Sequence, residues 1–213
     1  MTQTIPLRMT KDELANSLTH GLGILLGIIA IPFLGAKAII SGNLSAIIGS
    51  GMFGFGFMMV FTFSTLYHSI VQPDIKKTFR ILDHISIYFM IAGSYTPFIL
   101  IYMPSKTGYI ILAVQWILTL LGTIYKIFFT GKFKWFSTIV YLAMGWMIVL
   151  VIGPFVDSLP LLSLWLIVAG GLLYTVGVVF YKWYSLPYHH AIWHVFVLAA
   201  SICHFVAVWV AVK

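Results

Sequence analysis

The chain has 213 residues, of which 61% are apolar and only 8% are charged. Soluble domains are about 45–50% apolar and about 25% charged, so a soluble protein of this length would leave much apolar surface in water. Disordered chains are rich in charge and poor in aromatic residues, whereas 16% of this chain is aromatic. The composition predicts an integral membrane protein with several spans, in agreement with a mean hydropathy of +1.04.

The apolar runs of this chain predict helices. In lipid, every backbone N–H and C=O must be bonded within the protein, which restricts spanning segments to helices and closed barrels. Barrel strands would alternate in hydropathy over about ten residues, and the runs here are longer and do not alternate. We therefore predict an all-α protein with one membrane domain over residues 1–213, in which residues 1–16 form a short polar cytoplasmic segment. That segment lacks the features of a cleaved secretory signal, so we expect it to be retained.

Seven stretches are long enough to cross a bilayer, which needs about 20 mostly apolar residues. Short turns that contain glycine, proline, serine or asparagine separate them. The stretches are Ser17–Ile40, Leu44–Ser69, Thr78–Tyr102, Gly108–Phe129, Trp135–Phe155, Leu161–Tyr181 and His189–Val212. Seven crossings would place the two termini on opposite sides of the membrane.

The basic residues predict the orientation. If the N-terminus is cytoplasmic, nine of the twelve lie inside, namely Arg8, Lys11, Lys76, Lys77, Arg80, Lys126, Lys132, Lys134 and Lys182. Three, Lys37, Lys106 and Lys213, lie outside. Because every loop is short, the positive-inside bias applies, and we expect a cytoplasmic N-terminus and an external C-terminus. This orientation accounts for the basic excess, and no basic face with spare polar surface indicates a nucleic-acid partner.

His190 and His194 stand four residues apart at the start of the last stretch. Their rings project from one helix face, with Cβ atoms about 5–6 Å apart. This spacing suits two ligands of one tetrahedral metal ion, as in H-E-x-x-H sites, although no glutamate stands between them here. Such pairs also arise by chance, so the alternative is a pair of packing residues.

A serine, a third histidine and one aspartate extend this hypothesis. Ser64 and His68 repeat the four-residue spacing at the end of the second stretch, and Asp83 is the one acid inside the third. An ionisable group within a span costs roughly 2.5–3.5 kcal/mol. With His68 as a third ligand, the residues predict a catalytic metal site with an open position for water. The alternative for Asp83 is an interfacial ion pair with Arg80. We expect no special role for the other acids, Asp12, Glu13, Asp74 and Asp157.

Two further histidines receive different interpretations. His20, with Asn16 one turn before it, is expected to cap or brace the cytoplasmic mouth of the site. His204 lies ten residues after His194, about 15 Å further along a helix, so it cannot bind the same ion. We interpret His204 as a packing residue, with a proton relay as the alternative.

These motifs resemble the hemolysin III family, the bacterial branch of the progestin and adipoQ receptors, which include the adiponectin receptors. The shared motifs are S-x-x-x-H on the second span, an aspartate early in the third and H-x-x-x-H on the seventh. Here they are Ser64 to His68, Asp83, and His190 to His194. Residues 13–21 also resemble the opening of the family's first span, and the resemblance covers nearly the whole chain.

The resemblance implies a zinc ion bound by His68, His190 and His194 in the cytoplasmic leaflet of a bacterial plasma membrane. It also implies that Asp83 holds the reacting water and that Ser64 supports it. In the receptor and ceramidase relatives, this site is linked to hydrolysis of lipid amides. The chain lacks the long N-terminal region of the receptors, so hormone binding of that kind is not expected.

Three functions remain open at this point. The first is a zinc-dependent hydrolase whose partners are membrane lipids, with an amide or ester substrate that enters from the bilayer. The second is a haemolysin or pore-forming cytolysin, which the family name suggests, although the spans carry almost no polar stripe beyond the histidine cluster. The third is a sensor or regulator of membrane lipid state without turnover. None of the motifs specifies an oligomeric state.

Overall fold

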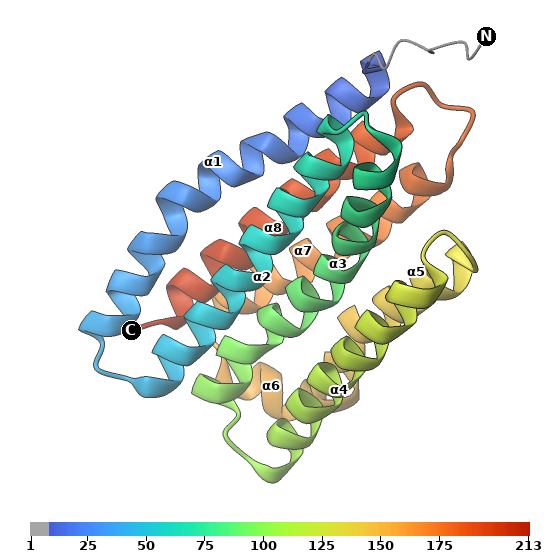
Figure 1. Ribbon diagram of the computed structural model, residues 1–213. Helices are drawn as coiled ribbons and strands as arrows, with labels where there is room; N and C mark the ends of the chain where they lie inside the picture. The colour runs from blue at the N-terminus through green and yellow to red at the C-terminus, as the bar shows by residue number, and fades with distance from the viewer. Residues whose placement is uncertain (1–8) are drawn as a thin grey trace, which may run out of the picture.

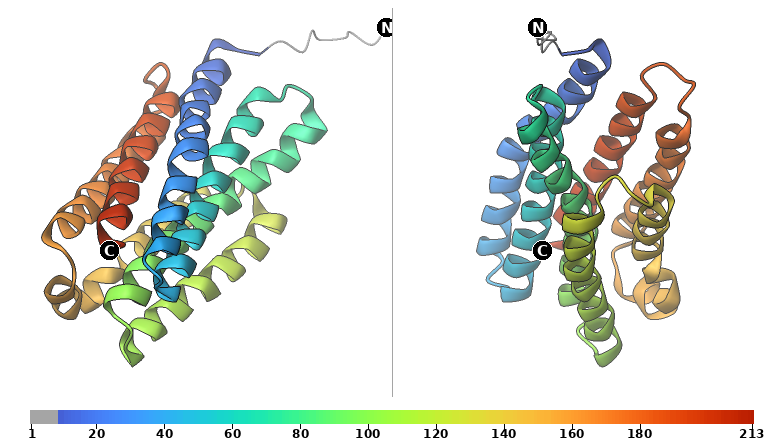
Figure 2. Two further views of the ribbon diagram at one scale, coloured as in Figure 1. Left: turned by 90° about the vertical axis from the view of Figure 1, so that its left-hand side faces the viewer. Right: turned by 45° about the vertical axis from the view of Figure 1, so that its right-hand side comes forward.

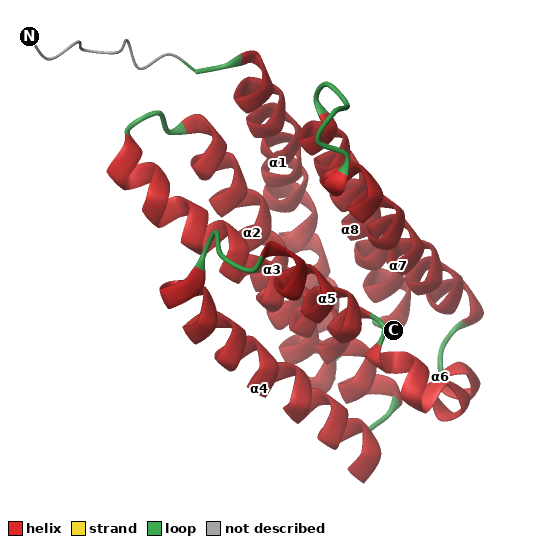
Figure 3. Ribbon diagram, turned by 90° about the vertical axis from the view of Figure 1, so that its right-hand side faces the viewer, coloured by secondary structure: helices red, strands yellow, loops and turns green. Residues whose placement is uncertain are grey.

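A computed structural model describes residues 9–213, apart from the side chains of Lys134 and Pro154. The first eight residues of the predicted polar segment, which include Arg8, lie outside the described residues. The described part of the chain is a bundle of helices joined by short loops, and no strand occurs in it (Figure 3). The prediction of an all-α membrane protein is confirmed at this level.

The helices closely follow the apolar stretches of the sequence. They are α1 (Lys11–Ile40), α2 (Leu44–Ser69), α3 (Pro73–Tyr102), α4 (Lys106–Phe129), α5 (Lys134–Gly145), the 3₁₀ turn η1 (Met147–Val151), α6 (Ile152–Ser158), α7 (Leu161–Lys182) and α8 (His189–Ala211). Six of them, namely α1, α2, α3, α4, α7 and α8, are long and apolar enough to cross a membrane.

The fifth apolar stretch differs from the expectation of one continuous helix. It is divided into α5, η1 and α6. Gly145 ends α5, the 3₁₀ turn that follows is rich in β-branched residues, and Pro154 lies in the first turn of α6, where a missing N–H disrupts no helical bond. The seven-span count and the orientation of the termini therefore stay predictions.

The first helix starts earlier than the apolar pattern indicates. Thr10 is its N-cap, and the Thr10 hydroxyl accepts a hydrogen bond from the Glu13 backbone N–H at 3.2 Å. This cap allows α1 to begin at Lys11 instead of Ser17. In a complete capping box the Glu13 carboxylate would turn back toward the Thr10 backbone N–H. It points instead toward α2, where it contacts His68.

The first and last helices run parallel and in contact. Near their starts, the His194 ring hydrogen-bonds the Asn16 carbonyl, and near their ends, the Lys37 ammonium donates to the Trp209 carbonyl at 2.7 Å. The start of α1 and the end of α8 consequently lie at opposite ends of the bundle (Figures 1 and 2). The start of α1, the end of α2 and the start of α8 meet at one end, which we call the proximal end.

Glycines bring α2 and α3 together at the centre of the bundle. A Cβ atom on Gly56 would lie 2.6 Å from the Phe89 carbonyl oxygen, and one on Gly93 would lie 2.7 Å from the Met52 carbonyl oxygen. No larger residue fits at either position without separating the helices. This close approach joins the middles of α2 and α3, the two helices that carry His68 and Asp83.

Candidate metal centre

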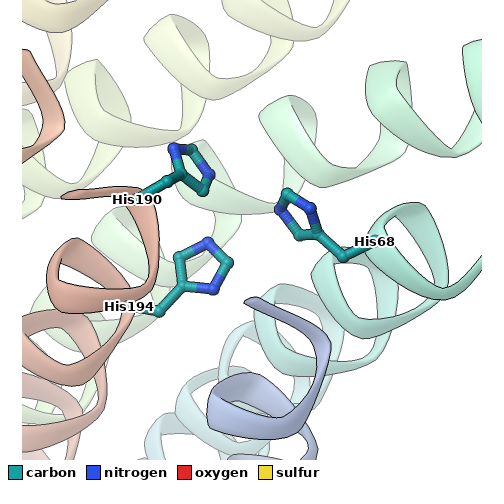
Figure 4. A group of neighbouring side chains, drawn as sticks. All are labelled: His68, His190 and His194. Atoms are coloured by element: carbon teal, nitrogen blue, oxygen red, sulfur yellow. The ribbon is translucent and has the colours of Figure 1, made fainter. Parts of the chain in front are cut away.

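Three histidine side chains converge at the proximal end (Figure 4). His68 ends α2, and His190 and His194 occupy the first two turns of α8. One ring nitrogen from each lies within 4.8 Å of the others. Tetrahedral zinc holds nitrogens about 3.4 Å apart, at about 2.0–2.1 Å from the ion, so the rings would move inward on coordination. The structure thus brings together the three histidines that the sequence singled out.

The partners of the His68 ring leave its Nε2 atom available. Nδ1 lies 2.5 Å from Oε2 of Glu13, and a carboxylate accepts a hydrogen bond, so Nδ1 is the donor. In the neutral ring, Nε2 then carries the lone pair. This nitrogen is buried and has no hydrogen-bond partner in the described part of the chain. A histidine that donates one N–H to a carboxylate and presents its other nitrogen to a metal is a common ligand arrangement.

His194 is oriented in the same way by α1. Its Nδ1 atom donates to the backbone carbonyl of Asn16 at 3.0 Å, and this acceptor also leaves Nε2 as the nitrogen with a free lone pair. The ring is only 2% exposed. Acceptors on α1, the Glu13 carboxylate and the Asn16 carbonyl, therefore select the tautomers of two of the three candidate ligands.

Asn16 and His20 lie where the sequence suggested a supporting role. The Asn16 amide nitrogen is 3.4 Å from Nδ1 of His68, so this residue contacts two of the three histidines. The His20 ring stacks on the His194 ring with centroids 3.7 Å apart, and it packs edge-on against Phe61. Both residues are buried. Their bracing position is clear, whereas their role in metal binding stays a prediction.

Ser64 and Asp83 face the same cavity as the histidines. Ser64 lies one turn before His68, and its buried hydroxyl has no hydrogen-bond partner among the described residues. The Asp83 side chain is 15% exposed, and one of its oxygens lies 3.7 Å from Nδ1 of His84. No ion pair within 4 Å joins Asp83 to Arg80 in the described structure, which does not favour the alternative interpretation of Asp83.

Glu13 is the residue that sequence reasoning missed. We expected it to have no special role, but one of its oxygens contacts His68 and the other lies 2.9 Å from the Lys76 ammonium. The spacing contained a signal, because Glu13, Asn16 and His20 fall on one face of a helix. Glu13 lies before the apolar run that begins at Ser17, so the apolar pattern alone does not place it on the first span.

A cavity of about 700 Å³ connects the histidine cluster to the rest of the bundle. The residues around its middle include Val60, Ile87, Met90, Ile91 and Leu142, so much of its wall is apolar. His204 lies in the deeper part, and both of its ring nitrogens are buried without a partner in the described residues. A cavity that combines a cluster of nitrogen donors with apolar walls suits a ligand that has both a polar group and a hydrocarbon chain.

Comparisons with known proteins identify the family of this chain. Residues 9–205 match the family described as Haemolysin-III related. Hemolysin-3 of Bacillus cereus is 44% identical over 204 residues, which are 94% of this chain and 93% of that protein. A Hemolysin-3 homolog of Bacillus subtilis (strain 168) is 42% identical over 93% of each chain. The human monocyte to macrophage differentiation factor is 30% identical over 93% of this chain and 83% of its own length. This chain is a membrane protein that belongs to the haemolysin-III-related family.

Proposed function

We propose that this protein is a membrane-embedded, zinc-dependent hydrolase of lipid amides or esters. The observation that carries the proposal is the set of three convergent imidazoles, two with a free Nε2, beside a cavity with apolar walls and a carboxylate. Sites that only stabilise a fold usually surround zinc with four protein ligands, whereas three leave a position for water or substrate. A buried group of this polarity within spanning helices is costly, which favours a function over simple packing.

The donor set fits zinc. The buried Nε2 atom of His68 lacks a partner, and Nδ1 of both His68 and His194 is held by an acceptor, as histidine ligands usually require. A zinc ion held there would polarise a scissile carbonyl and make water a stronger nucleophile at neutral pH.

The remaining residues supply acid–base chemistry. Hydrolysis adds water across the acyl C–N or C–O bond and yields a carboxylic acid and an amine or alcohol. Asp83 takes the proton from the attacking water and returns it to the leaving nitrogen or oxygen. The free hydroxyl of Ser64 donates a hydrogen bond to the water or to the carbonyl oxygen. The apolar walls hold the acyl chain.

The site is proposed to lie in the cytoplasmic leaflet of the bacterial plasma membrane. The described members of the basic set predicted to be cytoplasmic, from Lys11 to Lys182, lie on helix ends and a loop at the same end of the bundle as the histidine cluster, which is the proximal end. The substrate would then enter from the inner leaflet. Labelling of single cysteines at the two termini, from each side of sealed vesicles, tests this orientation.

A pore-forming haemolysin is the second candidate, and the printed names of the two Bacillus relatives favour it. The described histidine and lysine side chains that are buried, His20, His68, Lys126 and His194, gather at one end of the bundle, whereas a pore needs a polar lining along its full length. A lipid sensor without turnover would use the same metal centre but release no product.

One experiment separates the three candidates. Purified protein is analysed for metal, then incubated with ceramides, other acyl amides and phospholipids, and the products are followed by mass spectrometry. We expect bound zinc and a released fatty acid, with no product from His68→Ala, and wild-type turnover from His189→Ala as the neighbouring control. Leakage of liposomes that is equal in wild type and His68→Ala would support the pore. Bound zinc without any product would support the sensor.

A further inference from the structure

Lys126 is a buried cation in the last turn of α4. Its side chain is 2% exposed, and its ammonium nitrogen lies 2.6 Å from the Ser137 hydroxyl of α5. The same nitrogen lies 5.9 and 5.6 Å from the ring centroids of Tyr125 and Tyr141. A lysine near a helix end usually extends to the headgroups and keeps its charge in water. Lys126 turns inward instead.

No carboxylate neutralises this charge directly. In the part of the chain that the structure describes, no carboxylate oxygen lies within 4 Å of the Lys126 ammonium or the Arg80 guanidinium. Lys76 provides a contrast, because it pairs with Glu13 at 2.9 Å. The C-terminal dipole of α4 stabilises the cation, but by less than the burial of a charge within a span costs. An anion bound beside Lys126 would stabilise its charge.

Arg80, Lys126 and Lys132 line one side of the cavity that holds the histidine cluster, and we call them the basic lobe. Arg80 extends over the loop between α4 and α5, where a Cβ on Gly131 would lie 3.0 Å from its terminal nitrogen. Asp83 is the one carboxylate among the lining residues of α3, α4 and α5. Three cations against one carboxylate leave this side of the cavity positive.

We propose that the basic lobe binds the phosphate of a lipid headgroup. A phosphate presents several oxygens, which suits the forked donors of Arg80 together with the point charge of Lys126. The lobe opens into the same cavity as the apolar walls, so the anion and a hydrocarbon chain can belong to one molecule. Since the metal centre lies in that cavity, the scissile carbonyl of an anionic phospholipid would then lie at the histidines. This last step rests on the proposed hydrolase function and narrows its substrate class.

Binding of matched lipids tests the lobe without any turnover. Full-length protein in a neutral detergent is titrated with phosphatidic acid and with diacylglycerol of the same acyl chains, and binding is followed by native mass spectrometry and thermal shift. We expect phosphatidic acid to bind about tenfold more tightly than diacylglycerol, and Lys126→Gln to lose about tenfold for phosphatidic acid only. Lys106→Gln, an exposed lysine at the other end of the same helix, is the matched control.

Replacement variants and competing ligands complete the experiment. If Lys126→Gln does not fold, Arg80→Gln and Ser137→Ala replace it, with the same expected loss. Equal binding of the two lipids, or an unchanged preference in these variants, would overturn the proposal. Competition by inorganic phosphate as strong as that by phosphatidic acid would also overturn it, because the ligand would then be a free anion. A fatty acid that binds the lobe as tightly as phosphatidic acid would overturn the choice of phosphate.

The metal centre is varied separately. We expect His68→Ala to keep the preference for phosphatidic acid while it loses zinc. If the protein prefers phosphatidic acid over diacylglycerol but hydrolyses no lipid, the phosphate site is supported and the hydrolase function is rejected. Hydrolysis of neutral and anionic lipids at equal rates, without a binding preference, would reject the lobe and retain the hydrolase.

Discussion

The two ends of the bundle are built from different chemistry. Among the buried side chains of the described structure, the histidines and lysines, namely His20, His68, Lys126 and His194, all lie at the proximal end, and the partly buried His204 lies deeper in the bundle. At the opposite end, the buried residues of α1, α2 and α8 are mainly small or aliphatic, namely Leu34, Ala38, Ala46, Val208 and Ala211. Lys37 is partly exposed there and lies over the Trp209 ring. The contrast indicates that the opposite end mainly packs the helices together, while the proximal end holds the candidate metal centre.

Removal of a candidate ligand gives the largest expected effect. His68→Ala, His190→Ala or His194→Ala should each abolish bound zinc in purified protein, because two imidazoles cannot hold the ion in this geometry. Metal content by mass spectrometry is the measurement, and His189→Ala should retain full zinc. If all three variants keep full zinc, the ligand assignment is wrong.

Truncation at the opposite end should affect stability and leave the metal in place. Leu34→Ala removes a fully buried side chain and should cost about 2–5 kcal/mol through lost packing. The melting temperature in detergent should fall, whereas the zinc content of the folded fraction should stay complete. A loss of zinc from folded Leu34→Ala protein would contradict the inference that packing at the opposite end is independent of metal binding at the proximal end.

A change at the partner of His68 is expected to have an intermediate effect. Glu13→Gln keeps the size of the side chain but removes the charge that holds Nδ1–H of His68, and it should weaken zinc binding about 10- to 100-fold. Competition with a chelator measures the affinity. Asp12→Gln, at the neighbouring exposed acid, should leave the affinity unchanged. Equal affinities for wild type and Glu13→Gln would show that this contact does not support the metal.

The smallest effects should come from the helix caps. Thr10→Ala and Asn43→Ala each remove a side-chain N-cap and should cost about 1 kcal/mol, one at each end of the bundle. Only Thr10→Ala should also weaken zinc binding, because Glu13 lies in the turn that Thr10 caps. Thermal unfolding and chelator competition on both variants measure the difference. A weaker zinc site in Asn43→Ala would contradict it.

Much of the fold follows from local sequence, and the failures have physical causes. The second helix has the predicted bounds, Leu44–Ser69. Ile70 adopts an extended conformation and ends the helix, shortly before Pro73 begins the next one. The start of α1 was misplaced because a cap extended the helix into polar residues. The division of the fifth stretch depends on glycine and β-branched residues, whose weak helix preference an apolar window does not register.

The candidate site was only partly visible in the sequence. His190 and His194 share a helix face, so their proximity follows from spacing alone. The proximity of His68 to these two histidines depends on the packing of α2 against its neighbours. In the sequence, only the resemblance to the family motifs indicated that His68 belongs to the same site. Contacts of Glu13 and Lys126 with residues on other helices depend on the tertiary structure. Local pattern does not encode them.

The distance along the chain between the ligands has a consequence for biosynthesis. His68 leaves the ribosome long before His190 and His194, so the nascent protein has no complete donor set until its last helix has been inserted beside the first two. Cation capture would therefore mark the end of assembly and join the second helix to the final one. Truncated chains that stop before α8 would remain without metal, which gives the cell a chemical distinction between finished and unfinished copies.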